Sequence, residues 1–187
     1  MSAKIACDLR YPNPSIQNHS DVRLFLGLKV LLFTLLIPGT VILYFPYSMV
    51  LGSATGLHIA SLLLALPAGV FILVGLAIYL RCAWDFAVDG LGTPAPIDPP
   101  KHLVISGLYR RSRNPMYQGV LLLLLAECLL FPHAGLWIYV GSIALVFQTF
   151  VVFYEEPALR KRFGTAYADY CRQVPRWGFA VRDSSSK

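Results

Sequence analysis

The feature that most constrains the fold of this chain is an apolar run at residues 57–80 that contains no Asp, Glu, Lys or Arg. About 20 apolar residues cross the hydrocarbon core of a bilayer as a helix, so this run is long enough to span a membrane. Three further apolar runs have or approach this length, and they lie at residues 24–45, 115–131 and 136–154. The sequence therefore predicts an all-α membrane protein of about four transmembrane helices, built as a single integral membrane domain.

Composition supports this class and excludes others. Of 187 residues, 56% are hydrophobic and 14% are charged, and the mean hydropathy of +0.59 is too high for an ordinary soluble domain of this size. The four cysteines and four histidines are scattered without metal-ligand spacing, so we expect no metal site. The net charge of +6 needs no nucleic acid to explain it, because basic residues beside a membrane face anionic lipid headgroups.

The basic residues predict the orientation of the chain. Lys4, Arg10 and Arg23 precede the first predicted span, five Lys and Arg residues lie between the second and third, and seven follow the fourth. The short connections at residues 46–56 and 132–135 carry none. Because cytoplasmic loops are enriched in Lys and Arg, we expect both termini and the long central loop on the cytoplasmic side.

Two polar segments flank the third and fourth spans. Four prolines and two glycines in residues 88–100 exclude regular structure there, and residues 101–119 lead from this loop into a helix expected to start near Asn114 or Pro115. After the fourth span, Leu159, Phe163, Tyr167 and Tyr170 recur at helical spacing. Residues 155–177 are thus predicted to form a cytoplasmic amphipathic helix, kinked at Gly164 and lying either on the membrane or over a pocket.

Polar side chains that could carry chemistry gather at these segments. Arg110, Arg113, Asn114 and Tyr117 have spacings of three and four, so in a helix they would share one face able to grip an anion. The alternative is that the arginines only meet lipid phosphates. The Glu155–Glu156 pair is expected to attract a cation or to be a solvated helix end.

Glu127 falls inside the third apolar run. An intramembrane carboxyl group is a candidate functional group, here either a neutral hydrogen-bonded acid or the proton-coupling site of a four-span transporter.

These residues form an ordered set of motifs, which read Gly107-Leu108-Tyr109, Arg113-Asn114-Pro115-Met116-Tyr117-Gln118-Gly119, Glu155-Glu156-Pro157-Ala158-Leu159, Phe163-Gly164, Tyr167, Tyr170 and Val174-Pro175-Arg176. The set resembles the superfamily of isoprenylcysteine carboxyl methyltransferases and phospholipid N-methyltransferases, which are integral membrane enzymes. The resemblance covers about residues 101–177 with order and spacing preserved.

The resemblance implies an enzyme that uses S-adenosylmethionine, held on the cytoplasmic side, to methylate a lipophilic small molecule or lipid in the bilayer. The cofactor-binding residues that it implies are Lys101, His102, Leu103, Val104, Tyr109, Asn114, Pro115, Met116, Tyr117 and Glu155. Glu156 is the candidate base for an amine acceptor, and Arg113 or Arg176 would orient a carboxylate acceptor.

Two positions depart from the family pattern. Asn114 stands where the family has His, and it cannot act as a titrating base. Val151 stands where the carboxyl methyltransferases have a substrate-contacting Arg, so a prenylcysteine carboxylate would lack its charged partner. The acceptor group, carboxyl or amine, stays open, and a nicotinamide-dependent reductase on a related scaffold is a further alternative.

Overall fold

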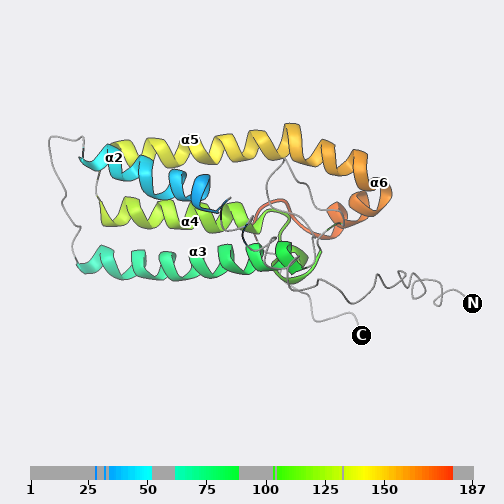
Figure 1. The fold of residues 1–187 in the computed structure, drawn as a ribbon, viewed down its shortest axis with the longest axis horizontal. Coiled ribbons are helices and arrows are strands. Elements are labelled where there is room, and N and C mark those ends of the chain that lie inside the picture. The colour runs from blue at the N-terminus through cyan, green and yellow to red at the C-terminus, as the bar shows by residue number, and fades with distance from the viewer. Residues whose placement is uncertain are drawn as a thin grey trace, which may run out of the picture.

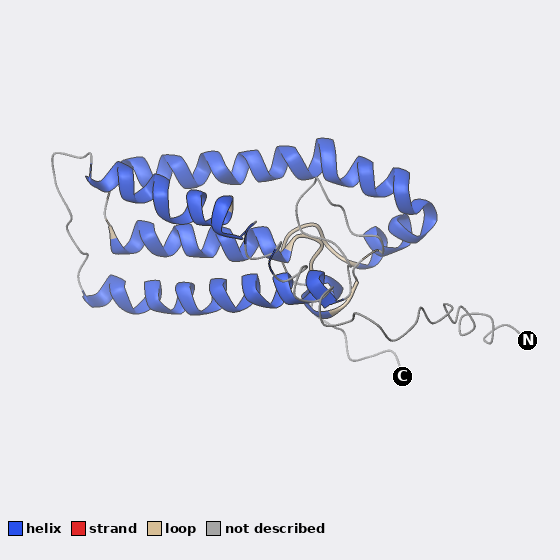
Figure 2. Ribbon diagram, in the orientation of Figure 1, coloured by secondary structure: helices blue, strands red, loops and turns tan. Residues whose placement is uncertain are grey.

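The computed structural model describes residues 28, 32, 34–51, 62–88, 103, 105–131 and 133–178. Within these residues the regular structure is helical and there is no strand (Figure 2). The elements in chain order are the π-turn η1 (Thr40–Tyr44), α2 (Phe45–Leu51), α3 (Leu62–Val88), the 3₁₀ turn η2 (Gly107–Arg110), α4 (Pro115–Leu130), α5 (Ala134–Phe150), the π-turn η3 (Val151–Glu155) and α6 (Glu156–Gln173). The expected all-α membrane architecture is confirmed.

The helices of the bundle run alongside one another, with the chain turning at one end into α6 (Figure 1). Three of the described helices are long and apolar enough to cross a membrane, namely Thr34–Leu51, Leu63–Asp85 and the continuous helix Ala134–Gln173, while Pro115–Leu130 is a shorter apolar helix. The predicted start of α4 is confirmed, because Asn114 is its N-cap and Pro115 its first residue.

Three predicted boundaries differ from the structure. The first helix does not end at Phe45 but continues to Leu51, so the predicted loop at residues 46–56 is wrong for its first six residues. Helix α3 continues past Leu80 to Val88. Its last part contains Arg81 and Asp85, which lie one turn apart and form an ion pair of 3.2 Å, and this pairing stabilises charged residues within a helix. The turn before α5 is shorter than expected, since the helix begins at Ala134.

Helices α3 and α4 pack most closely at a pair of glycines. A Cβ atom on Gly75 would lie 2.8 Å from the backbone oxygen of Gly119, and one on Gly119 would lie 2.9 Å from that of Gly75. Small residues of this kind let membrane helices approach until their backbones touch. The glycines thus bring α4 against α3 along its length.

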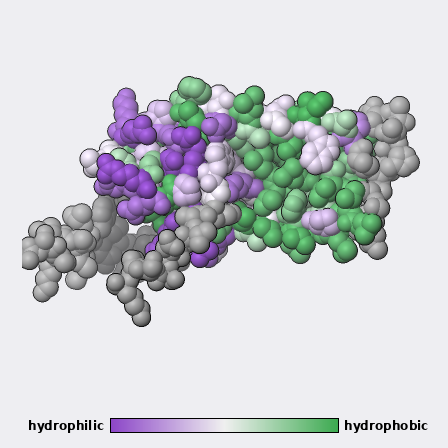
Figure 3. All heavy atoms as spheres, turned by 180° about the vertical axis from the view of Figure 1, so that it is seen from behind, coloured by the Kyte–Doolittle hydropathy of each residue, from purple (hydrophilic) through white to green (hydrophobic). Residues whose placement is uncertain are grey.

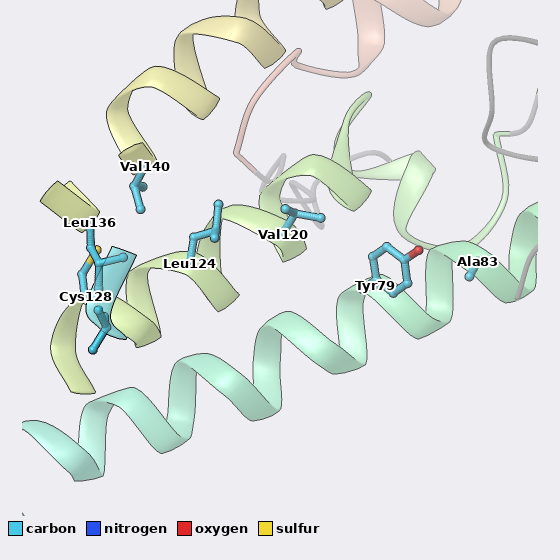
Figure 4. Packing of buried hydrophobic residues seen from close by; sticks show 8 residues of the cluster. Tyr79, Ala83, Val120, Leu124, Cys128, Leu136 and Val140 are labelled. Carbon is cyan, nitrogen blue, oxygen red and sulfur yellow. The ribbon is translucent and has the colours of Figure 1, made fainter. Parts of the chain in front are cut away.

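The core of the bundle lies between α4, its neighbours α3 and α5, and the end of α2. Figure 4 shows Val120, Leu124 and Cys128 of α4 lying along the side that meets Leu136 and Val140 of α5. Leu124 and Leu136 are each only 1% exposed. This packing holds α4 and α5 together in an arrangement that presents their site-forming ends side by side.

The first π-turn has a local cause in the sequence. Pro46 has no N–H, so the turn before it loses a helical donor, and Phe45 donates instead to the carbonyl of Thr40 in the wider π pattern. The freed carbonyl of Val41 accepts a hydrogen bond of 2.9 Å from the Tyr139 hydroxyl of α5. A proline thereby creates an acceptor that ties the first helix to the bundle.

The outer surface divides into an apolar part and a hydrophilic end (Figure 3). Leu63, Leu73 and Ile138 are 81%, 70% and 72% exposed, as expected where lipid replaces water around the helices. The helix Ala134–Gln173 has 40 residues, about twice the number that the hydrocarbon requires. Its apolar first part is therefore long enough to span the membrane by itself, and the crossing does not require its polar part from Glu155 onward.

Candidate active site

The polar end of the bundle begins with a tight turn between α3 and α4. Gly107 has a positive φ of 53°, which favours glycine, and a Cβ atom there would clash with a carboxylate oxygen of Asp85. The turn η2 ends at Arg110, and residues 112–114 are not helical. The expectation that Arg110, Arg113, Asn114 and Tyr117 share one helical face is therefore wrong. Arg110 is exposed, whereas the other three side chains donate to Glu156, to the carbonyl of Arg176 and to Glu155 respectively.

A second π-turn sets the directions of the two glutamates. Pro157 follows η3 at the same offset at which Pro46 follows η1, and Glu156 donates its backbone N–H to the carbonyl of Val151 in the π pattern. The missing N–H of the proline again explains the wider turn. The predicted break between the fourth span and the C-terminal helix is thus a π-turn within one continuous helix.

Glu156 is the centre of a buried ion-pair network with two arginines. Its carboxylate accepts hydrogen bonds of 2.6 and 3.0 Å from Arg176 and one of 2.9 Å from Arg113, and its side chain is only 9% exposed. Burial opposes the charge of Glu156, but the hydrogen bonds and positive charges of Arg176 and Arg113 outweigh it and lower the pKa of the carboxyl. A carboxylate neutralised in this way is a weak base, which argues against the base role expected for Glu156.

Glu155, the neighbouring residue, has a different environment. Its carboxylate accepts a hydrogen bond of 2.5 Å from the Tyr117 hydroxyl, whose ring packs on Phe147 of α5 at 4.5 Å between centroids. Burial raises the pKa of Glu155; the Tyr117 hydrogen bond partly counters this rise and the nearby charge of Glu156 adds to it. Among the described residues Glu155 forms no ion pair, in contrast to Glu156.

The segment after α6, Val174–Gly178, which we call the C-terminal strap, closes one side of this cluster. The Arg113 backbone N–H donates to the carbonyl of Pro175 at 2.9 Å, and the Asn114 side-chain amide donates to the carbonyl of Arg176 at 3.1 Å. Trp177 donates from its indole N–H to Gln148 of α5 at 2.6 Å. The strap therefore holds the start of α4 to the last turns of α5.

Helix α6 reaches the strap by bending back. Gly164 has φ 55° and ψ −125° inside the helix, which confirms the predicted kink there. Along the expected apolar face, Leu159 and Phe163 before the kink are half-buried. Tyr167 is 2% exposed, and the Tyr170 hydroxyl donates to the Tyr109 carbonyl at 2.7 Å.

The remaining predicted cofactor residues have varied positions. Tyr109 is 7% exposed and packs with Ile78 and Cys82 of α3, so its ring belongs to the core, and burial raises its pKa well above the ordinary value. Pro115 is fully buried at the start of α4, while Met116 is half-buried and Leu103 is half-buried ahead of η2. Lys101, His102 and Val104 lie outside the described residues.

Two features of the site were not expected from the sequence. Asp85 is 3% exposed, with one carboxylate oxygen paired to Arg81 and the other buried without a hydrogen-bond partner in the described structure. The only sequence signal for a buried Asp85 was its position one turn after Arg81, at the end of an apolar run. Val151, which stands where the carboxyl methyltransferases have an Arg, is 1% exposed, so it packs inside the protein.

A helical membrane protein that gathers carboxylates, arginines and tyrosines at one end of its bundle has the architecture of an integral membrane enzyme. The family model for phospholipid methyltransferases matches residues 64–166, and the chain belongs to that family. The resemblance expected from the motifs is confirmed, and membership indicates a membrane methyltransferase. A comparison with curated proteins gives no match, and one with solved structures gives none either.

Proposed function

We propose that the protein transfers a methyl group from S-adenosylmethionine to a lipophilic acceptor, with the cofactor bound at the Glu155–Tyr117 pair. The observation that carries the proposal is the contrast between the two adjacent glutamates. Glu156 is paired with Arg113 and Arg176, whereas Glu155 is held by the neutral Tyr117 hydroxyl. In a methyltransferase family, a buried carboxylate without a basic partner suits a cationic cofactor.

The donor set fits this cofactor. S-adenosylmethionine supplies, when bound, an activated methyl group on a positive sulfonium, together with an ammonium group and an apolar ring system. Glu155 offers a negative charge, Tyr117 holds that carboxylate in place, and Phe147 and Met116 offer apolar contact nearby. Burial of Glu155 strengthens its attraction for a cation and excludes water from the reacting groups. Catalysis would then come mainly from positioning.

An amine acceptor is favoured over a carboxylate. Both arginines expected to orient a carboxylate, Arg113 and Arg176, are bound to Glu156, so neither is available without breaking a buried ion pair. An amine must lose a proton before it is methylated, and the lowered pKa of Glu156 makes that carboxylate a poor proton acceptor.

Equilibrium binding of S-adenosylmethionine to purified protein tests the cofactor assignment. We expect saturable binding to the wild type and weaker binding to Glu155→Gln. Asp169→Asn is the control and should bind as the wild type does, because it changes only an ion pair of α6 in which the Asp169 side chain is 60% exposed. Absence of binding at several hundred micromolar, roughly the upper range of common enzyme constants, would refute the proposal.

A radiolabelled methyl-transfer assay with membranes tests the acceptor. Aminophospholipids, lipophilic amines and prenylcysteine analogues are compared in parallel, and we expect saturable transfer to an amine. Preferred methylation of the prenylcysteine carboxylate would show that an arginine leaves Glu156 to bind substrate, and would reject the amine assignment.

We also propose that the site and both termini face the cytoplasm. The described Arg and Lys residues from Arg110 to Arg113 and from Arg160 to Arg176 all belong to the polar end of the chain, as the positive-inside rule requires. This orientation is tested with a single cysteine introduced at the exposed position Arg111. A membrane-impermeant reagent is applied to intact and to opened vesicles of known sidedness, and the extent of labelling is compared.

A further inference from the structure

A cavity of about 620 Å³ lies at the other end of α4 from the Tyr117–Glu155 pair, between α4 and the first helix. Its walls come from η1, α2 and the last turn of α4. The volume falls within the range of small-molecule sites, about 300–1,000 Å³. Leu43 and Tyr47 on its rim are 66% and 61% exposed, so the cavity opens toward the lipid around the helices.

The wall of this cavity carries one carboxyl group, that of Glu127. One of its oxygens is buried and has no hydrogen-bond partner in the described structure. No described Lys or Arg lines the cavity, and His133 just beyond the helix end forms no ion pair with Glu127 among the described contacts. A carboxyl group in this setting lacks the donor or cation that normally accompanies it.

Three aromatic residues, Tyr44, Tyr47 and Phe131, line the same cavity. Aromatic faces attract cations, and rings grouped around an acidic side chain are the usual surroundings of alkylated ammonium groups. The π-turn η1 contributes Thr40, Leu43 and Tyr44 to this wall, and such turns often occur at functional positions. Charge and shape therefore favour a positively charged ligand with an apolar body.

The depth of Glu127 suits the head of an amphiphile. Helix α4 has 16 residues, about 24 Å at about 1.5 Å per residue, which is shorter than the ~30 Å of hydrocarbon. Glu127 lies three residues before its end at Leu130, within one turn of the recessed helix end. A ligand head can reach this position from the membrane surface while its chain lies along the apolar rim.

We propose that this cavity is a second ligand site, which binds the ammonium head of a lipophilic alkylammonium compound against Glu127, Tyr44 and Tyr47. The site is separate from the methyl-transfer site and does not depend on its assignment. A single-chain amphiphilic amine and the choline or ethanolamine head of a phospholipid share this chemistry. The surroundings select for the charged nitrogen, not for a phosphate, since no described basic side chain lies in the cavity.

Photolabelling in lipid nanodiscs tests the proposal. One probe is a dodecyltrimethylammonium ion with a diazirine in its chain, a second is its neutral tert-butyl isostere, and a third is a phosphatidylcholine with the same chain. We expect the ammonium probe to label peptides of residues 40–51 or 121–131, with saturation, and the isostere to label them weakly. Labelling by the third probe would identify a phospholipid as the ligand. Labelling by the first probe alone would identify a single-chain ammonium amphiphile.

Two variants sharpen the test. Glu127→Gln should weaken binding of the ammonium probe about tenfold, and Tyr47→Leu, which keeps apolar area on an exposed rim, should weaken it about threefold. Neither change should affect the isostere or S-adenosylmethionine binding, whereas Ser142→Ala on the exposed face of α5 should change nothing. Equal labelling by charged and neutral probes, labelling of other peptides in the wild type, or full affinity in Glu127→Gln would overturn the proposal.

Discussion

The opposite environments of Glu155 and Glu156 predict opposite effects of the same substitution on stability. Glu156→Gln removes the anion that three hydrogen bonds join to Arg113 and Arg176. The Arg113 side chain is 14% exposed and stays buried without an anionic partner, whereas Arg176 is 33% exposed and regains water. Breaking a buried pair costs about 3–5 kcal/mol, and the partial exposure of Arg176 places this case at the low end, about 3 kcal/mol.

Glu155→Gln should leave stability unchanged or raise it. The raised pKa of Glu155 means that folding disfavours its charged form, so a neutral amide removes a cost while its oxygen still accepts the Tyr117 hydrogen bond. The assay is thermal unfolding of both variants and the wild type in one detergent at one scan rate. Asp169→Asn is the matched control, because its ion pair with Arg172 is exposed at both side chains and such pairs contribute about 0–1 kcal/mol.

The pH dependence has a defined sign for each residue. The folded-state pKa of Glu156 is lowered, so its contribution is present above the unfolded value near about 4.3 and is lost as pH falls through the folded-state value. The wild type and Glu156→Gln should therefore converge in strongly acidic buffer. For Glu155, with its raised pKa, the advantage of the Gln variant should disappear as pH is lowered toward the unfolded value. Wild-type stability in Glu156→Gln, together with a loss in Glu155→Gln, would refute the assignment of the two environments.

Three further substitutions test other contacts. Tyr117→Phe removes the hydrogen bond to Glu155 and should weaken S-adenosylmethionine binding by about 1.5–3 kcal/mol, measured by titration calorimetry; equal affinity would remove Tyr117 from the site. Gly75→Ala places a methyl group 2.8 Å from a backbone oxygen of α4 and should cost about 1–3 kcal/mol in thermal unfolding, whereas Gly69→Ala, with open space around it, should not. Tyr139→Phe leaves the freed carbonyl of the first π-turn without its donor and should cost about 1–3 kcal/mol, and an unchanged unfolding temperature would show that this carbonyl finds another partner.

The site could be predicted from the sequence as a set of residues but not as a set of contacts. The ordered motifs predicted that the start of α4, the glutamate pair and the Val174-Pro175-Arg176 segment act together, and the Tyr117–Glu155 hydrogen bond agrees with that grouping. They could not predict that Arg113 and Arg176 bind the same glutamate. That arrangement depends on how the C-terminal strap folds back against the start of α4 and against α5. Helical spacing failed for Arg110 because η2 ends the local periodicity.

The sequence by itself determined the helical class, the start of α4 and the kink at Gly164, because membrane length, proline at a first helical position and the lack of a Cβ act locally. Only the tertiary structure decided which of two adjacent glutamates is neutralised. That choice depends on the π-turn before Pro157, which sets the direction of each side chain, and on arginines 43 and 20 residues away in the chain. A pattern of residue types does not indicate which of two neighbouring carboxylates a distant guanidinium will reach. The interaction energy of each possible pair depends on packing and burial in the folded protein.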